Sequence, residues 1–229
     1  MSQNEPKISS SPLYGCAILL IAACTFGGIV GWTLYSGYRQ DKEIGFFTVD
    51  KAEALPVANL DAAQKDALSQ RLKTFAESAK KGEKVVLELT MDDLNALLVL
   101  AADSEVGDYR SIVWFTGIDA TGKLLMADLC WPMNGLFLKG ESKRYLVGQG
   151  GFEPTFDNKS FDLHIVTLTV PGKTVSPGFL RNLGNWPWLN LAKLKPEIAA
   201  VLGKITAFEV VSEKRVLRLI ADPAVKPAS

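Results

Sequence analysis

An uncharged and mostly apolar stretch near the start of the chain runs from Leu13 to Tyr35 and contains no Asp, Glu, Lys, Arg or His. About 20 such residues let an α-helix cross the roughly 30 Å hydrocarbon core of a bilayer with every backbone N–H and C=O hydrogen-bonded internally. Trp32, Tyr35 and Tyr38 stand at its C-terminal end, where interfacial aromatic residues gather, and Arg39 opens a charged segment. The sequence therefore predicts a single-pass transmembrane helix, of the signal-anchor kind, over residues 13–35.

Two other interpretations of this stretch stay open. Ile21-Ala22-Ala23-Cys24 is compatible with a lipoprotein signal, although the residues that follow Cys24 are apolar, where a mature lipoprotein would turn polar. A cleaved signal peptide would have a shorter apolar region. Gly27 and Gly31 are spaced as in the Gly-x-x-x-Gly pattern that lets two transmembrane helices approach closely, so they are candidate self-association residues.

The sequence gives opposing signals about which side of the membrane holds the rest of the chain. Lys7 precedes the apolar stretch, whereas Arg39 and Lys42 follow it, and the positive-inside rule then favours a cytosolic C-terminal domain. The resemblance of the N-terminal stretch to an export signal favours the other side. We expect an extracytoplasmic domain.

Charge and cysteine content limit the functions open to the remainder. Lys plus Arg and Asp plus Glu both number 25, so no basic field exists to attract nucleic acid. Cys16 and Cys24 lie inside the apolar stretch, which leaves Cys130 without an intradomain disulfide partner. We expect a disordered tail at 1–12, a linker at 36–59, one domain at 60–221 and a second tail at 222–229. Within the linker, Phe46 and Phe47 either rest on the membrane surface or pack on the domain.

Two amphipathic helices are marked by their ends. Asp61 and Gln64 have capping-box spacing, and Gly82 follows a helix predicted over residues 61–81. A short strand over residues 85–89 then leads into a second helix capped by Thr90. Asn95 is unfavourable inside a helix, so it either points to solvent or ties the helix to the backbone of a neighbouring strand, which we favour.

The segment Leu89-Thr90-Met91-Asp92-Asp93-Leu94-Asn95-Ala96-Leu97-Leu98 resembles the L-T-x-x-x-L-N-x-L-L signature near the start of membrane-anchored exported domains of the YpmS-like and YceB-like kinds. The likeness extends to the later strand order, the 175–180 segment and the closing helix and hairpin. It implies one anchored α+β domain with a curved antiparallel sheet around helices, no known catalysis, and binding of an apolar ligand or a partner. It carries over no functional residues.

Strand-like alternation begins after Arg110. Residues 111–118 and 123–131 flank a tight turn at Asp119-Ala120-Thr121-Gly122, and further strands follow over residues 144–156 and 160–170. Gly148, Gly150 and Gly151 indicate a bulge or a close approach of another backbone. Ser176 and Pro177 start a brief helix, and residues 205–211 and 215–220 form a last hairpin. The predicted fold is α+β, with a transmembrane helix before a curved antiparallel sheet packed against amphipathic helices.

Candidate site residues are few. Trp186 and Trp188 stand on either side of Pro187 and, with Phe179, are candidate ligand- or partner-binding residues, although the two tryptophans could instead cover one end of the core, which we favour. His164 is the only histidine, so we expect no metal site and no cofactor. A Cys130–His164 nucleophilic pair would require adjoining strands, and Cys130 lies in an apolar segment that would keep it inert.

The favoured hypothesis is a non-enzymatic anchored domain that contacts the lipid bilayer and binds an envelope protein or an apolar ligand, with no nucleic-acid partner. The alternative is a scaffold or assembly subunit recognised through the transmembrane helix. A lipoprotein or a hydrolase of unknown substrate ranks third.

Overall fold

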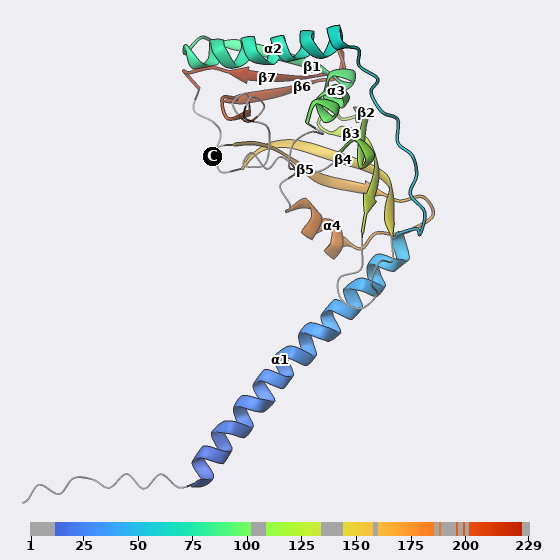
Figure 1. The fold of residues 1–229 in the computed structure, drawn as a ribbon, viewed down its shortest axis with the longest axis vertical. Coiled ribbons are helices and arrows are strands. Elements are labelled where there is room, and N and C mark those ends of the chain that lie inside the picture. The colour runs from blue at the N-terminus through green and yellow to red at the C-terminus, as the bar shows by residue number, and fades with distance from the viewer. Residues whose placement is uncertain are drawn as a thin grey trace, which may run out of the picture.

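The structure, a computed structural model, describes residues 12–101, 109–133, 144–157, 160–185 and 202–225, with residues 188, 196 and 199. The fold is α+β: one long N-terminal helix precedes shorter helices and two antiparallel sheets (Figure 1). This confirms the predicted fold class and the N-terminal helix. The strands form two sheets, whereas the prediction had one.

The N-terminal helix α1 (Pro12–Phe47) is long and apolar enough to cross a membrane. None of its most apolar window is buried against the rest of the described chain. Ile18 and Phe26, for example, are 66% and 71% exposed. A core helix of a soluble domain would bury such side chains, so this segment needs an apolar surrounding that the described chain does not supply.

The C-terminal end of α1 extends beyond the predicted span and enters the domain. Ile44 and Phe47 are buried, and the Phe47 ring lies 4.7 Å from that of Phe179 in α4 (Pro177–Gly184). Phe46, in contrast, is 68% exposed. Of the two neighbouring phenylalanines, Phe47 therefore packs on the domain and Phe46 does not.

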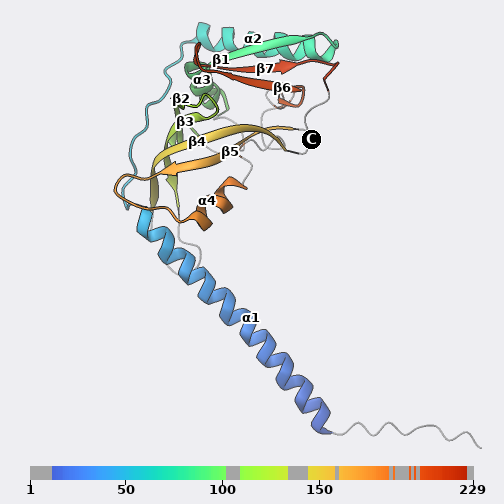
Figure 2. The same ribbon diagram turned by 180° about the vertical axis from the view of Figure 1, so that it is seen from behind.

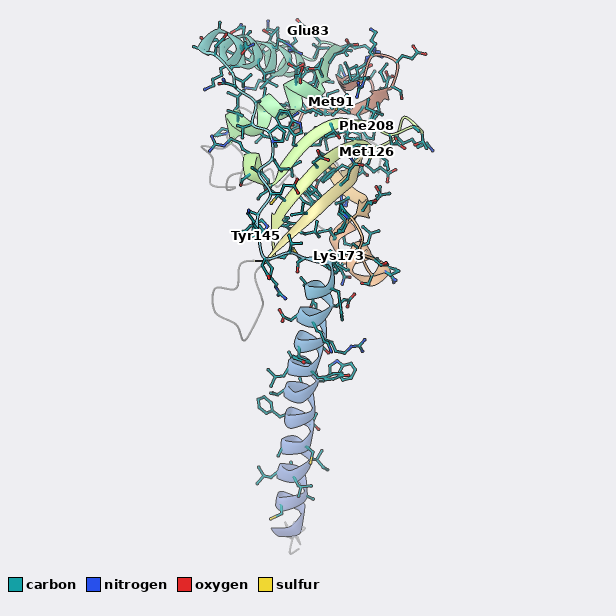
Figure 3. All side chains as sticks on the ribbon, turned by 90° about the vertical axis from the view of Figure 1, so that its right-hand side faces the viewer. Glu83, Met91, Met126, Tyr145, Lys173 and Phe208 are labelled. Atoms are coloured by element: carbon teal, nitrogen blue, oxygen red, sulfur yellow. The ribbon has the colours of Figure 1, made fainter. Side chains whose placement is uncertain are left out.

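Hydrogen bonds fix the same junction. Arg144 donates to the backbone carbonyl and the carboxylate of Asp41, and Lys173 Nζ donates to the Thr48 carbonyl oxygen at 2.7 Å. Val49 and Tyr145 exchange backbone hydrogen bonds of 2.8 and 2.7 Å. Figure 3 shows Tyr145 and Lys173 beside the end of α1. The domain is thus attached to α1 through a packed and hydrogen-bonded junction.

The chain after this junction runs along one edge of the domain toward α2 (Ala62–Lys80), as Figure 2 shows. It makes contact on the way, because the Glu53 N–H lies 3.3 Å from Cys130 Sγ. Only this part of the predicted 36–59 linker is non-helical, since residues 36–47 belong to α1.

Helix α2 has the predicted ends. The Gln64 N–H donates to Asp61 Oδ1 at 2.7 Å, and the Asp61 N–H donates to Gln64 Oε1 at 3.0 Å, which confirms the capping box. Gly82 has φ +75°, the left-handed conformation that glycine adopts without a Cβ penalty. Figure 1 shows α2 at the end of the domain farthest from α1.

Sheet B contains β1 (Val85–Thr90), β7 (Val216–Ala221) and β6 (Ala207–Val211) in that order. The central strand is therefore the last in the chain, and Leu87 of β1 pairs with Leu219 of β7. Residues at positions 87, 89, 217 and 219 are buried, so one face of sheet B contributes to the core.

Sheet A contains β2 (Val113–Ile118), β3 (Leu125–Pro132), β4 (Tyr145–Asp157) and β5 (Ser160–Thr169) in chain order. Asp119 holds the β2–β3 turn by accepting from the backbone N–H groups of Thr121, Lys123 and Leu124. Gly122 has φ +73°, as the predicted tight turn requires.

The glycines of β4 occupy the close approaches that the sequence predicts. The register shifts between Gly151 and Phe152, which marks a bulge. A Cβ at Gly148 would collide with the Thr169 carbonyl oxygen, and one at Gly150 would lie 2.8 Å from a methyl carbon of Leu129. Gly148 is therefore required by the backbone of the neighbouring strand, whereas a Cβ at Gly150 would have to displace side-chain ends.

Candidate functional site

A cavity of about 140 Å³ lies between the two sheets, and we call it the inter-sheet cavity. Its walls come from both sheets, from α3 (Met91–Ala101) and from the short helix η1 (Tyr109–Ser111). The lining side chains are aliphatic or aromatic: Leu89, Leu94, Leu97, Leu98, Tyr109, Val113, Phe115, Phe152, Phe161, Leu163, Trp188, Leu202, Leu217 and Leu219. Such a lining accepts an apolar molecule.

Helix α3 forms one wall and is held in place at its N-terminus. The Asp93 N–H donates to Thr90 Oγ1 at 3.1 Å, and the Thr90 N–H donates to Asp93 Oδ2 at 3.0 Å. The predicted Thr90 cap is therefore confirmed, with the Asp93 side chain completing a reciprocal pair. The cap fixes the start of α3, whose leucines line the cavity between the sheets.

Asn95 joins this helix to sheet A. Its Nδ2 donates to the Phe115 carbonyl oxygen at 2.9 Å, and its Oδ1 accepts from the Phe115 N–H at 2.8 Å. Asn95 is 2% exposed, so both backbone groups of Phe115 would lose their partner without solvent access if the amide were removed. The predicted tie between helix and strand is confirmed.

Trp188 lies at one side of the inter-sheet cavity. Its ring is 5.0 Å from the rings of Trp131 and Phe152, and its backbone N–H donates to Asp162 Oδ1 at 3.1 Å. The indole Nε1 is buried and has no hydrogen-bond partner in the described part of the chain. A buried N–H without an acceptor is unfavourable, and the apolar atoms of Trp188 contribute to the cavity wall.

The charged side chains near the cavity point elsewhere. Arg71 Nη1 is 2.8 Å from Asp93 Oδ1 on the α2 side of α3. Partial burial raises the pKa of Asp93, but hydrogen bonds from Arg71 and Thr90 outweigh this and leave the pKa lowered. Burial raises the pKa of Tyr109, so its hydroxyl stays protonated at neutral pH. The cavity wall is therefore uncharged at neutral pH.

A second recess of about 300 Å³ lies between α1 and α4, and we call it the juxtamembrane crevice. Unlike the cavity, it combines aromatic, polar and charged side chains: Trp32, Tyr35, Ser36, Arg39, Gln40, Glu43, Ile44, Gly178, Phe179 and Asn182. The α4 wall is positioned by its cap, because the Phe179 N–H donates to Ser176 Oγ at 3.1 Å. This confirms the helix start predicted at Ser176 and Pro177.

The candidate binding residues do not share one site. Phe179 lines the juxtamembrane crevice, whereas Trp188 lines the inter-sheet cavity. Trp186 lies outside the described residues. Gly27 and Gly31 lie on the exposed part of α1, where an added Cβ would meet no atom within 4 Å.

The strand registers separate the two residues of the nucleophilic pair that the sequence left open. Cys130 of β3 pairs with Val147 of β4, whereas His164 of β5 pairs with Glu153, six positions further along β4. At about 3.3 Å per residue, this offset is on the order of 20 Å, so the pair does not form. His164 instead contacts the Gly184 carbonyl oxygen through Nδ1. Over the described ranges, no group of three or more His, Cys, Asp or Glu side chains is suited to hold a metal.

No protein-family model, no curated protein and no solved structure matches this chain. Its class is thus defined by its own architecture: an α+β domain of two antiparallel sheets behind a helix long enough to cross a membrane. The resemblance of residues 89–98 to exported membrane-anchored domains stays a prediction.

Most cavity residues gave no functional signal in the sequence. Leu163, Leu217 and Leu219 fit ordinary strand patterns. The pairing of β1 with β7 places Leu217 and Leu219 beside β1, and Leu163 comes from β5 of the other sheet. The charged residues of the crevice could be identified in the sequence, because they belong to the segment that ends the apolar stretch. The sequence did not predict that α4 would form the opposing wall.

Proposed function

We propose that this protein is a single-pass, membrane-anchored binding domain that holds a small apolar molecule in the inter-sheet cavity. The observation that carries the proposal is the cavity itself, with its apolar walls contributed by both sheets and α3. In this proposal α1 is the membrane span and the domain is extracytoplasmic.

The apolar lining supports a ligand. A molecule that enters the cavity removes its own apolar surface and that of the lining side chains from water, at about 25 cal/mol per Å². It also gains dispersion contacts with the surrounding leucine and phenylalanine side chains.

The lining restricts the chemistry of the ligand. Apolar cavities of about 150 Å³ stay dry and admit a molecule of benzene size, so the buried part of the ligand has about that bulk. A charged group would be buried in this wall without a partner, which is costly. We therefore propose a small, uncharged apolar molecule.

Binding fits this wall better than catalysis does. Among the lining residues, only Tyr109 has an ionisable side chain, and its raised pKa opposes a role as a base. Acid–base catalysis needs a group that exchanges its proton near the working pH. The proposed role is accordingly non-enzymatic.

Tryptophan quenching by brominated probes tests the proposal with the full chain, because α1 contributes buried residues to the domain. We expect bromobenzene to quench saturably through Trp131 and Trp188, whereas 6-bromohexanoate should not bind, because its carboxylate is charged at neutral pH and the wall offers it no charged partner. Leu97→Phe, which adds bulk to the lining, should remove the saturable quenching, and Val166→Phe, outside the lining, should leave it unchanged. Quenching that rises linearly without saturation would contradict a defined site.

A further inference from the structure

The juxtamembrane crevice lies at the end of the apolar part of α1, and its position follows from helix geometry once α1 spans the bilayer as proposed above. With a rise of 1.5 Å per residue, Arg39 lies about 6 Å and Glu43 about 12 Å beyond Tyr35 along the helix axis. A headgroup layer occupies about 5–8 Å on each side of the hydrocarbon core. Trp32 and Tyr35 match the aromatic belt at its inner edge. The crevice therefore opens at headgroup depth and just above it.

The crevice presents two opposite charges in a fixed order. Arg39 and Glu43 are four residues apart on one helix, so their Cβ atoms are about 5–6 Å apart. In the described part of the chain neither takes part in an ion pair, whereas Arg144 and Asp41, at the same junction, pair with each other. The cation is nearer the hydrocarbon core and the anion is further out.

We propose that the juxtamembrane crevice binds the headgroup of a zwitterionic phospholipid with a primary ammonium group, its phosphate at Arg39 and its ammonium at Glu43. The phosphate of such a lipid is attached to the glycerol and the ammonium is at the free end, so the lipid's charges follow the same inward-to-outward order. Guanidinium pairs strongly with phosphate oxygens, and a carboxylate accepts N–H hydrogen bonds from a primary ammonium.

The two charges together disfavour headgroups without a primary ammonium. Phosphatidylglycerol would satisfy Arg39 but would bring no cation to Glu43. A quaternary ammonium has no N–H to donate and is too bulky for a close contact with the carboxylate. Selectivity thus resides in Glu43, and affinity for phospholipid in general resides in Arg39.

The opposing wall is packed against the end of α1 and leaves room for the headgroup. Phe179 of α4 contacts the buried Phe47, and this contact joins α4 to the end of α1. Gly178 also lines the crevice, and a Cβ at this position would meet no atom within 4 Å. The space in front of Gly178 is open to a ligand.

Lipid retention by the full chain tests the proposal. The protein is purified in mild detergent with equimolar phosphatidylethanolamine, phosphatidylcholine and phosphatidylglycerol, and retained lipids are counted by native mass spectrometry. We expect about one retained phosphatidylethanolamine, at least fivefold above either competitor. Arg39→Gln should reduce retention of all three lipids, and Glu43→Gln should abolish the preference while retention persists.

Two further variants separate a site from a general charge effect. Lys42→Gln removes a neighbouring exposed cation that does not line the crevice and should leave retention unchanged. Gly178→Leu should fold as well as the native chain yet retain at least fivefold less lipid, because the new side chain occupies the crevice. Equal retention of the three lipids by the native chain, or unchanged selectivity in Glu43→Gln, would overturn the proposal.

Membrane insertion is measured separately in the same preparations. Release of the native chain from membranes by alkaline carbonate would overturn the span and, with it, the crevice proposal. Resistance to carbonate without selective lipid retention would overturn the crevice proposal alone and leave the proposed function standing.

Discussion

The inter-sheet cavity and the juxtamembrane crevice are built in opposite ways. The cavity is formed by side chains from elements far apart in the sequence, and its wall is uncharged at neutral pH. The crevice is formed by one helix face and a short facing helix, and it displays Arg39 and Glu43. Under the two proposals, the first recess selects a ligand by shape and apolar area, and the second selects by charge. The two ligands proposed for this chain would then not compete with each other.

The largest effect on stability should come from replacing Asn95, because this residue ties α3, one wall of the cavity, to sheet A. Replacing it by Leu leaves the N–H and C=O of Phe115 buried without partners, at about 1–3 kcal/mol each. We expect Asn95→Leu to lower the free energy of unfolding by roughly 2–5 kcal/mol in chemical denaturation. Gln70→Leu, an exposed change on α2, is the control. A loss below about 1 kcal/mol would mean that the Asn95 bonds do not hold α3 against sheet A.

A pair of glycine substitutions contrasts the close strand packing of sheet A with the open juxtamembrane crevice. Gly148→Ala places a Cβ against the Thr169 backbone in sheet A and should cost about 1–3 kcal/mol. Gly178→Ala faces the open crevice in a helix and should be neutral or stabilise by up to about 1 kcal/mol. The thermal unfolding temperature should fall clearly in Gly148→Ala and stay unchanged or rise in Gly178→Ala. Equal shifts of the unfolding temperature in the two variants would contradict the difference in packing.

A pH-dependent change in stability should come from Asp119, which lines neither recess. Hydrogen bonds from the Thr121 hydroxyl and from backbone N–H groups lower the pKa of Asp119 well below its ordinary value. The pKa of Asp119 is lower in the folded chain than in the unfolded chain. Ionised Asp119 therefore stabilises the fold above about pH 4, and this contribution is lost as the pH falls toward the folded-state pKa. The stability difference between the native chain and Asp119→Asn should thus shrink below about pH 4. A difference that stays constant down to pH 2 would contradict this, and Asp66→Asn is the surface control.

The smallest effect is expected from the glycines of α1. Gly27→Ile with Gly31→Ile should change ligand binding in the cavity by less than twofold, because neither residue is near it. Loss of binding together with a change in oligomeric state would favour the scaffold hypothesis instead. The readouts are the brominated-probe titration and the mass of the detergent-solubilised protein.

Local signals in the sequence predicted a good part of the fold. The Asp61 and Thr90 caps, the Asp119 turn and the β4 glycines each depend on neighbours within a few residues or on one local steric need. The unfavourable place of Asn95 inside a helix left two options, a solvent-facing side chain or a tie to a strand, and its burial in the structure agrees with the tie. The local pattern at Phe46 and Phe47 did not decide which of them would be buried, since that depends on where α4 packs.

There is a physical reason why the cavity could not be predicted from the sequence. It depends on β1 pairing with β7, so that Val85 aligns with Ala221, and no short-range pattern encodes such a pairing. The separation of Cys130 from His164 likewise follows from the register of β4 between them. Trp188 was proposed as either a binding residue or a cover of the core. In the structure it packs on Trp131 and Phe152 and also lines the cavity.

Native mass spectrometry of the full chain extracted from its own membrane tests the central claim most directly. We predict one small apolar molecule per native chain, absent from Leu97→Phe, in which the larger side chain fills the cavity, and retained by Val166→Phe, which alters a more exposed position of β5 outside the cavity lining. A native chain that carries no such molecule and does not take up bromobenzene would contradict the proposed function.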